Sequence, residues 1–307
     1  MNTLAEEAHS VKKVISLVLL VFSISLVQAQ ERPAITGIAF VRFYAADRDT
    51  SAAFYQGVLG YTRVRMKYFD LYPVSDSQWF EVTPLPTPAP PARLAAVAYT
   101  TRDAAALEKY LRAHSVVIVQ KLTHGQFGVK DPEGNLVIFV QTGSFKIPGG
   151  AFSDRALSRR IIHVGFAVQS AAEEDKFYRD ILGFHLNWRG GRKRDEDTDW
   201  ISDQVPDGSD WLEYMLNGGL NPGIQRMGVM DHFSLGVAKI SDVVDGLARN
   251  QNTTPDNSKI ETGRDGKLQL DLFDPDLSRV EYMEFKPSVK TCCSPILGKL
   301  PSEVEEK

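Results

Sequence analysis

The sequence predicts an α+β protein built from two copies of one module. Three short segments recur in the same order along the 307-residue chain, which is the signature of an internal repeat. The three pairs are Phe54–Tyr61 with Phe177–Phe184, Trp79–Glu81 with Trp211–Glu213, and Asp131–Asn135 with Asp274–Ser278. We therefore expect modules at 35–141 and 160–287, separated by a Gly/Ser/Pro-containing connector and followed by a tail at 288–307.

Each module is expected to contain two half-units, each made of a strand, a helix and further strands. In the second module, residues 171–182 predict a helix that ends at Gly183, because glycine commonly follows a helix end. A second helix is expected to be capped by Ser241 and to run to Arg249. The strands expected in this module are 161–168, 185–189, 211–216, 232–238, 267–273 and 279–285.

The N-terminal residues predict a secretory signal peptide at 1–29. Lys12 and Lys13 precede an apolar run, and Ala29 ends a small-residue motif of the kind that signal peptidases cleave. The run is shorter than the roughly 20 apolar residues of a membrane span. We expect an exported protein, periplasmic or secreted, without a membrane span in the mature chain. The alternative is an uncleaved N-terminal anchor.

Charge and cysteine content exclude some functions and leave others open. The net charge of −4 argues against a nucleic-acid partner, because such proteins carry basic faces that neutralise phosphates. The two cysteines, Cys292 and Cys293, are adjacent in the C-terminal tail. They would pair between chains, bind metal, or remain two thiols without a role.

Two histidines occupy matching places on two strands of the second module. Side chains alternate across a strand, so His163 shares a face with Gly165 and Ala167 while bulky apolar residues take the other face. His232 likewise shares a face with small residues, among them Ser234. Each strand therefore presents one imidazole at the rim of a space floored by small side chains.

Two glutamates complete the pattern. Glu213 follows His163 by 50 residues and Glu281 follows His232 by 49, and both lie in otherwise apolar strands. A half-buried carboxylate is costly unless it is paired or binds a metal. One such histidine or glutamate alone would ordinarily be structural. All four at matched positions of a repeated unit predict a site for a divalent ion, held by His163, Glu213, His232 and Glu281.

These features resemble the vicinal oxygen chelate superfamily, which includes glyoxalases, methylmalonyl-CoA epimerase, extradiol dioxygenases and bleomycin-resistance proteins. The FYRDILGF segment, the Asp-Pro-Asp turn and the His…Glu…His…Glu order carry the resemblance, which covers both modules. It implies modules of paired βαβββ units, whose curled mixed sheets enclose a metal-centred cleft. It also implies that the four ligands occupy the first and last strands of each unit.

The first module departs from this pattern and is expected to hold no metal. We assign Gly37 as the counterpart of His163 and Ile138 as that of Glu281, and the strand at 94–100 offers no imidazole. Only Glu81 remains, for which a structural or substrate-shaping role is expected.

The number of protein ligands favours proton transfer over dioxygenase activity and over binding without turnover. Four protein ligands in a six-coordinate shell leave two adjacent positions, which suit a substrate with two neighbouring oxygens. The ion in such a shell would be Ni, Co, Zn, Mn or Fe. Glu213 or Glu281 would then shuttle a proton, as in glyoxalases and epimerases. If Glu213 points away from the metal, the other three residues form the triad of an Fe(II) or Mn(II) dioxygenase. A small-molecule binding protein without turnover is the third alternative.

The sequence leaves open the role of one charged loop and the way in which the two modules pair. The loop Arg189–Arg194 would receive an anionic substrate group, although the acidic residues that follow it also fit a solvated charged loop. The two modules would pair within one chain or across a homodimer.

Overall fold

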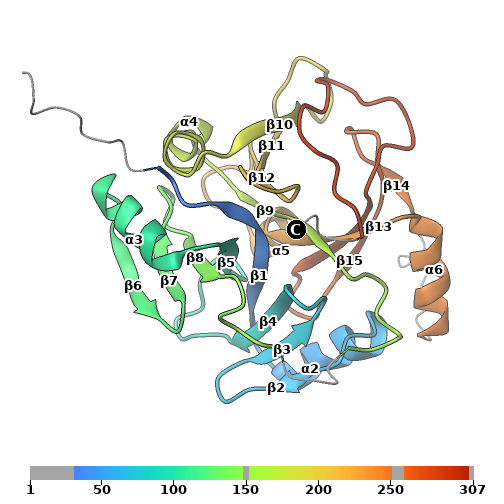
Figure 1. Ribbon diagram of the computed structural model, residues 1–307. Coiled ribbons are helices and arrows are strands. Elements are labelled where there is room, and N and C mark those ends of the chain that lie inside the picture. The colour runs from blue at the N-terminus through green and yellow to red at the C-terminus, as the bar shows by residue number, and fades with distance from the viewer. Residues whose placement is uncertain (1–30, 148–151, 251–258, 304–307) are drawn as a thin grey trace, which may run out of the picture. The chain divides into compact units, whose positions relative to one another are not determined.

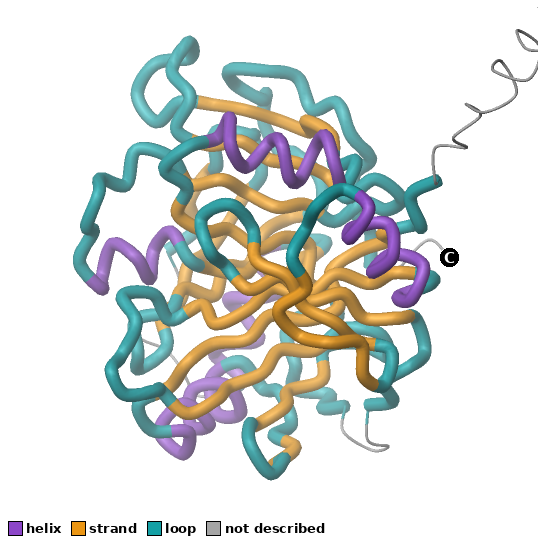
Figure 2. The backbone as a smooth tube through the Cα atoms, turned by 90° about the vertical axis from the view of Figure 1, so that its left-hand side faces the viewer, coloured by secondary structure: helices purple, strands orange, loops and turns teal. Residues whose placement is uncertain are grey.

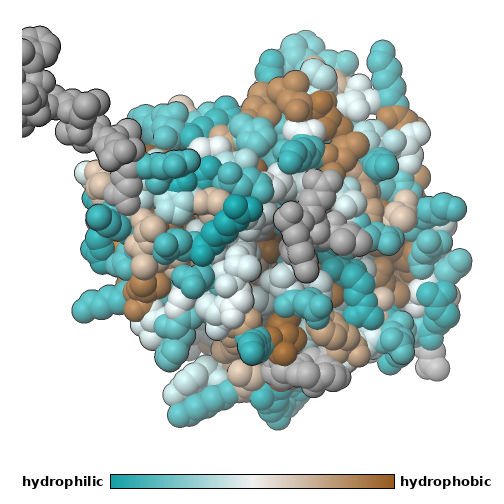
Figure 3. Space-filling model, in the orientation of Figure 1, coloured by the Kyte–Doolittle hydropathy of each residue, from teal (hydrophilic) through white to brown (hydrophobic). Residues whose placement is uncertain are grey.

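The computed structural model describes residues 31–147, 152–250 and 259–303. The described residues from Pro33 onward belong to one compact unit. The expected signal peptide lies outside the described residues. Among the residues described, no helix is both long and apolar enough to cross a membrane. On the face drawn in Figure 3, hydrophilic side chains predominate and hydrophobic ones form separate small areas.

Two eight-stranded mixed sheets confirm the expected α+β fold. The first sheet has the order β2-β3-β4-β1-β5-β8-β7-β6, and the second has the corresponding order β10-β11-β12-β9-β13-β16-β15-β14. The first contains β1 (Ile35–Ala45), β2 (Val64–Arg65), β3 (Asp70–Pro73), β4 (Trp79–Pro84), β5 (Leu94–Thr101), β6 (Ile118–Thr123), β7 (Gln126–Lys130) and β8 (Leu136–Gln141). The second contains β9 (Ile161–Ala167), β10 (His185–Gly190), β11 (Trp200–Gln204), β12 (Trp211–Met215), β13 (His232–Val237), β14 (Glu261–Thr262), β15 (Leu268–Phe273) and β16 (Arg279–Glu284).

The sheet order shows how the half-units join. In each module the first strand of one half-unit pairs antiparallel with the first strand of the other, β1 with β5 and β9 with β13. The last strand of each half-unit lies parallel beside its first strand, as β12 lies beside β9 and β16 beside β13. The two histidine strands and the two glutamate strands are therefore the four central strands of the second sheet.

Most helices lie at the periphery of the strands (Figures 1 and 2). Figure 1 shows α3 outside the first sheet and α6 outside the second. The α-helices within the described residues are α2 (Arg48–Ala52), α3 (Ala104–Ala113), α4 (Ala171–Asp175), α5 (Ile224–Met230) and α6 (Ile240–Arg249). The helices α2 and α4 each continue as a π-helical segment, η1 (Ala53–Val58) and η2 (Lys176–Ile181) respectively. The helix expected at 171–182 is thus formed by α4 and η2 together.

The expected cap of α6 at Ser241 is wrong. The helix already begins at Ile240, so Ser241 lies inside its first turn. The buried backbone N–H of Ile240 donates to Glu284 Oε1 at 3.0 Å. A carboxylate on the neighbouring strand β16 therefore supplies the acceptor that a capping side chain would provide, which local sequence cannot reveal.

Reciprocal hydrogen bonds connect the two modules. The Tyr55 hydroxyl, from the first module, donates to Asp274 Oδ2 in the second at 2.8 Å. Tyr178, its counterpart in the repeat, donates to Asp131 Oδ2 in the first module at 3.3 Å. Each recurring tyrosine thus satisfies the recurring Asp-Pro turn of the other module, so the repeat motifs contribute to the contact between the modules.

The C-terminal tail packs along the edge of the second sheet. The Leu297 N–H donates to the Asn187 carbonyl at 2.8 Å, and Trp188 Nε1 donates to the Cys292 carbonyl at 3.1 Å. Cys292 and Cys293 form a disulfide with each other. None of the three interpretations drawn from the sequence included this pairing of adjacent cysteines.

Glu174, a buried carboxyl group between the modules, gives the fold a testable pH dependence. Its Oε1 accepts the Glu133 N–H at 3.0 Å, while Oε2 has no hydrogen-bond partner among the described residues. Burial, and then the charge of Asp131, raise the pKa of Glu174 to about 8. The native carboxyl group therefore stays protonated above the pH at which the unfolded one ionises, so stability falls as pH rises from about 4.5 to 8.

We expect Glu174→Gln to remove most of this dependence. The free energy of unfolding of the wild type should fall by up to a few kcal/mol more than that of the variant between pH 5 and pH 8, at about 1.4 kcal/mol per unit of pKa shift. Urea unfolding at a series of pH values measures the difference. The exposed Glu173 supplies the control variant Glu173→Gln. Parallel curves for wild type and Glu174→Gln would contradict this assignment.

Candidate metal centre

The structure brings the four sequence-predicted ligands together at the centre of the second sheet. The Nε2 atoms of His163 and His232 lie 3.0 Å apart. Glu281 Oε2 lies 3.1 Å from His163 Nε2, and Glu213 Oε2 lies 3.5 Å from His232 Nε2. One potential ligand atom from each of His163, Glu213 and His232 lies within 4.8 Å of the other two, whereas Glu281 does not join this set of mutually close atoms.

His232 is held in one orientation by its backbone contact and by an adjacent glycine. Its Nδ1 lies 2.8 Å from the Met230 carbonyl and donates to it, because a carbonyl can only accept. The neutral ring then carries its lone pair on Nε2, as a metal ligand requires. A Cβ placed on Gly165, the residue paired with His232 across the strands, would lie 2.1 Å from His232 Cε1. Only glycine at this position leaves room for the ring.

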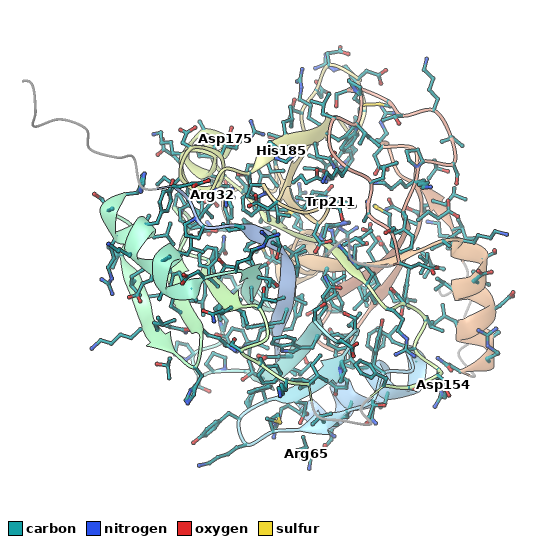
Figure 4. The ribbon with its side chains drawn as sticks, in the orientation of Figure 1. Arg32, Arg65, Asp154, Asp175, His185 and Trp211 are labelled. Atoms are coloured by element: carbon teal, nitrogen blue, oxygen red, sulfur yellow. A yellow bond between two sulfur atoms is a disulfide. The ribbon has the colours of Figure 1, made fainter. Side chains whose placement is uncertain are left out.

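His163 is held mainly by stacking. Its ring lies against the Trp211 indole, with centroids 4.7 Å apart and planes 28° apart. The Lys267 ammonium lies 4.4 Å from the Trp211 ring centroid and bonds Asp265 at 2.8 Å. The Nδ1 atom of His163 has no hydrogen-bond partner among the described residues. Trp211 of β12, which is labelled in Figure 4, is a site residue that the sequence analysis used only as part of the repeat.

Trp211→Leu is expected to weaken metal binding about tenfold, which lies within the range for the loss of a group that orients a ligand. Without the indole, His163 loses the contact that fixes its ring. The measurement is the dissociation constant of the metal, determined by competition with a chelator. Trp79 has the matching position in the first module and stacks on Phe40, so Trp79→Leu is the control. Equal effects of the two variants on metal affinity would contradict the role of Trp211.

Burial and neighbouring charges set the protonation of the site. Burial lowers the pKa of His163, and burial followed by the charge of Arg279 lowers that of His232. Both imidazoles are therefore neutral near pH 7. Burial, and then the charge of Glu281, raise the pKa of Glu213 to about 8. Burial opposes ionisation of Glu281, but contact with His163 and the charge of Arg279 lower its pKa.

The donor set fits a divalent ion. Two nitrogens bound at about 2.1 Å and at right angles to one ion are about 3 Å apart, which matches the two Nε2 atoms. Glu281 Oε2 is buried and lies 3.1 Å from His163 Nε2, but it makes no contact of hydrogen-bond geometry with a described residue. Two imidazoles and two carboxylates suit borderline first-row ions. His163, Glu213, His232 and Glu281 would hold such an ion between β9, β12, β13 and β16.

The first module fills the matching position with a protein cation. Strand register places Phe40 opposite Trp79, as His163 lies opposite Trp211. The assignment of Gly37 as the counterpart of His163 is therefore wrong, because it did not apply the spacing of the recurring Phe-Tyr segments to this strand. By the same register, Arg42 replaces Gly165.

Arg42 explains the role of Glu81. Its Nε lies 2.6 Å from Glu81 Oε2, and Trp79 Nε1 donates to Glu81 Oε1 at 2.8 Å. Ala96 stands where His232 stands in the second module, while Ile138 keeps its assigned place as the counterpart of Glu281. A guanidinium thus neutralises the remaining glutamate, which gives Glu81 the structural role named as one alternative.

A cavity of about 380 Å³ adjoins the second-module site. Its volume is within the range of small-molecule sites. Glu213 and Glu281 lie on its wall, together with the aromatic side chains of Trp188, Trp200 and Trp211. Of the two glutamates, Glu213 is the more accessible, with 15% of its side chain exposed against 3% for Glu281.

Comparison with known proteins agrees with this architecture. The model of the Glyoxalase/Bleomycin resistance protein/Dioxygenase superfamily matches residues 37–139 and again 160–282. The chain belongs to this superfamily, as the sequence resemblance implied.

Solved structures of extradiol enzymes share the fold. Homoprotocatechuate 2,3-dioxygenase from Arthrobacter globiformis superposes with a TM-score of 0.60 at 17% identity, covering 82% of this chain and 80% of that one. The enzyme from Brevibacterium fuscum, in complex with 3,4-dihydroxyphenylacetate, gives a TM-score of 0.59 at 17% identity, with coverages of 83% and 82%. No curated protein sequence matches the chain. At this identity the likeness extends to the fold alone.

Proposed function

We propose that the second module binds one divalent ion through His163, Glu213, His232 and Glu281 and catalyses proton transfer on a small molecule with two adjacent oxygens. One observation carries the proposal: the two imidazole Nε2 atoms face each other at 3.0 Å, and each has a carboxylate oxygen within 3.5 Å. Ni, Co, Zn, Mn and Fe are the candidate ions. When bound, the ion supplies Lewis-acid stabilisation of negative charge on the substrate oxygens.

Glu213 is the better candidate for the proton carrier. Its side chain is partly open to the cavity, while that of Glu281 is nearly closed off. Glu281 is also held by His163 at 3.1 Å and lies 3.7 Å from Arg279, so it is suited to remain ionised as a ligand. Glu213 would take the proton from the carbon beside a carbonyl and return it to the same or the neighbouring carbon.

Ring-cleaving dioxygenase activity is the second candidate. The solved structures described above are extradiol dioxygenases, and Glu213 lies farther from its histidine than Glu281 does. If Glu213 does not bind the ion, His163, His232 and Glu281 form a two-histidine, one-carboxylate set of the kind found in non-haem iron oxygenases. A non-catalytic binding protein is the remaining alternative, and the complete ligand set speaks against it.

Two assays on the metal-loaded protein separate these functions. Proton transfer predicts deuterium incorporation, followed by NMR in D2O, beside the carbonyl of α-hydroxyketones or of the methylglyoxal–thiol hemithioacetal. The dioxygenase predicts oxygen consumption with a panel of catechols and Fe(II). Deuterium exchange without oxygen uptake is the expected result. Oxygen uptake without exchange would replace the proposal with the dioxygenase.

We also propose that the protein is exported after cleavage behind Ala29. The support is the sequence pattern alone, with two lysines before an apolar run and a small-residue motif at its end. N-terminal sequencing of the protein from cell fractions tests it. A mature chain that begins at Gln30 is expected, and a full-length chain retained in the cytoplasm would contradict export.

A further inference from the structure

Almost every charge around the cavity beside the metal centre is already neutralised by a neighbour. Apart from the candidate ligands, the acidic residues on its wall are Glu261, Asp265 and Asp271, and each has a cationic partner. Two of the three wall arginines are also paired. The pairs are Lys259 with Glu261 at 2.5 Å, Lys267 with Asp265 at 2.8 Å, Arg279 with Asp271 at 3.1 Å, and Arg264 with Asp195 at 2.7 Å.

Arg192 is the exception on this wall. Its guanidinium lies over the Trp200 ring, 5.5 Å from the centroid. The carboxylate of Asp199 accepts the backbone N–H of Arg192 at 2.7 Å. Among the residues that the structure describes, no carboxylate forms an ion pair with the Arg192 guanidinium. A cation stacked on an aromatic face keeps its N–H groups free to bind an anion in the plane of the guanidinium.

The backbone around Arg192 is anchored on both sides. Arg264 Nε donates to the Gly191 carbonyl at 3.1 Å, and the Asp199 N–H donates to the Gly190 carbonyl at 2.9 Å. Gly191 is itself buried, and a Cβ there would lie 2.3 Å from the Arg194 carbonyl oxygen. The backbone on the N-terminal side of Arg192 is therefore closely packed. The residues from Arg192 to Glu196 are nevertheless exposed, as in the solvated charged loop considered as the alternative for 189–194.

We propose that Arg192 is the anion-binding residue of this cavity and receives a carboxylate of the substrate. The metal centre would bind two adjacent oxygens at one end of the substrate, and Arg192 would bind the carboxylate at the other end. Trp188 and Trp200 would flank the carbon atoms between them. The inference rests on the proposed function, because it requires the bound ion at the first end.

Matched chelators test this inference in the metal-loaded protein. The monohydroxamates of succinic, glutaric and adipic acids present two adjacent oxygens and a carboxylate at increasing distance, and their methyl esters lack only the charge. Binding is measured by calorimetry for the wild type, Arg192→Gln and Arg194→Gln. Arg194 is the control, because it is exposed, pairs with Asp197 at 2.5 Å and does not line the cavity.

We expect at least one acid to bind the wild type about tenfold more tightly than its ester, the usual size of a charge-assisted contact. Arg192→Gln should abolish this preference but leave ester binding and metal content unchanged, and Arg194→Gln should keep it. Equal binding of acids and esters by the wild type, or a preference that survives in Arg192→Gln, would overturn the inference while the metal centre stands. Failure of every hydroxamate to bind would overturn the proposed function and the inference with it.

Discussion

Replacing Gly165 by alanine is expected to reduce metal affinity about 100-fold, although all four candidate ligands stay in the chain. The new Cβ would lie 2.1 Å from His232 Cε1 and 2.6 Å from its Nδ1. The His232 ring cannot easily move aside, because it is fully buried and its Nδ1 is bonded to the Met230 carbonyl. Chelator competition measures the affinity, and the metal content of the purified variant gives a second reading.

Gly57→Ala is the matched control for this variant. Gly57 lies in the first module, and a Cβ there would meet no atom within 4 Å. The control should therefore keep wild-type metal affinity. If Gly165→Ala folds and binds metal as tightly as the wild type, the His232 ring does not provide a ligand in the orientation described.

Glu213→Gln is expected to reduce the rate of deuterium exchange by about 10²- to 10⁴-fold, the usual contribution of a positioned general base. Glutamine keeps the shape of the side chain and an oxygen for the ion but cannot accept the substrate proton. We expect most of the metal to remain bound. Exchange rates and metal content are measured on the same samples.

Glu281→Gln should behave differently, because Glu281 lies 3.1 Å from His163 and deep in the site. Its replacement should lower metal content as well as activity. A Glu213→Gln variant with full exchange activity would show that Glu213 is not the proton carrier. If instead Glu213→Gln lost metal and Glu281→Gln kept metal but lost exchange activity, Glu281 would be the base and Glu213 the ligand.

The repeat allowed much of the second module to be predicted from sequence. Strand alternation placed His163 and His232 on faces with small residues, and the structure brings these faces together because β9 and β13 are neighbours. The matched spacing of the two glutamates predicted a glutamate strand in each half-unit, and the structure shows that these strands, β12 and β16, lie beside the histidine strands. Their roles as metal ligands remain a prediction that metal analysis must test.

What the sequence missed depends on contacts between distant segments. Trp211 lies against His163, 48 positions earlier in the chain, and Glu284 caps the helix that begins at Ile240. Neither contact can be predicted from neighbouring residues in the sequence, because the two partners lie far apart in the chain. The Gly37 assignment was wrong for another reason. The spacing between the recurring Phe-Tyr segments, counted back from His163, leads to Phe40, but it was not applied to this strand. The strand register shows that Phe40 is the counterpart.

The metal content of the protein is the most direct test of the central claim. Wild type and His232→Ala are purified without chelators and compared by elemental mass spectrometry. The account predicts about one divalent ion per wild-type chain and its loss in the variant, because removal of one imidazole opens the site. Nickel, cobalt or zinc would favour proton transfer and iron would favour the dioxygenase, whereas manganese fits both. No metal in the wild type, even after incubation with each ion, would contradict the account.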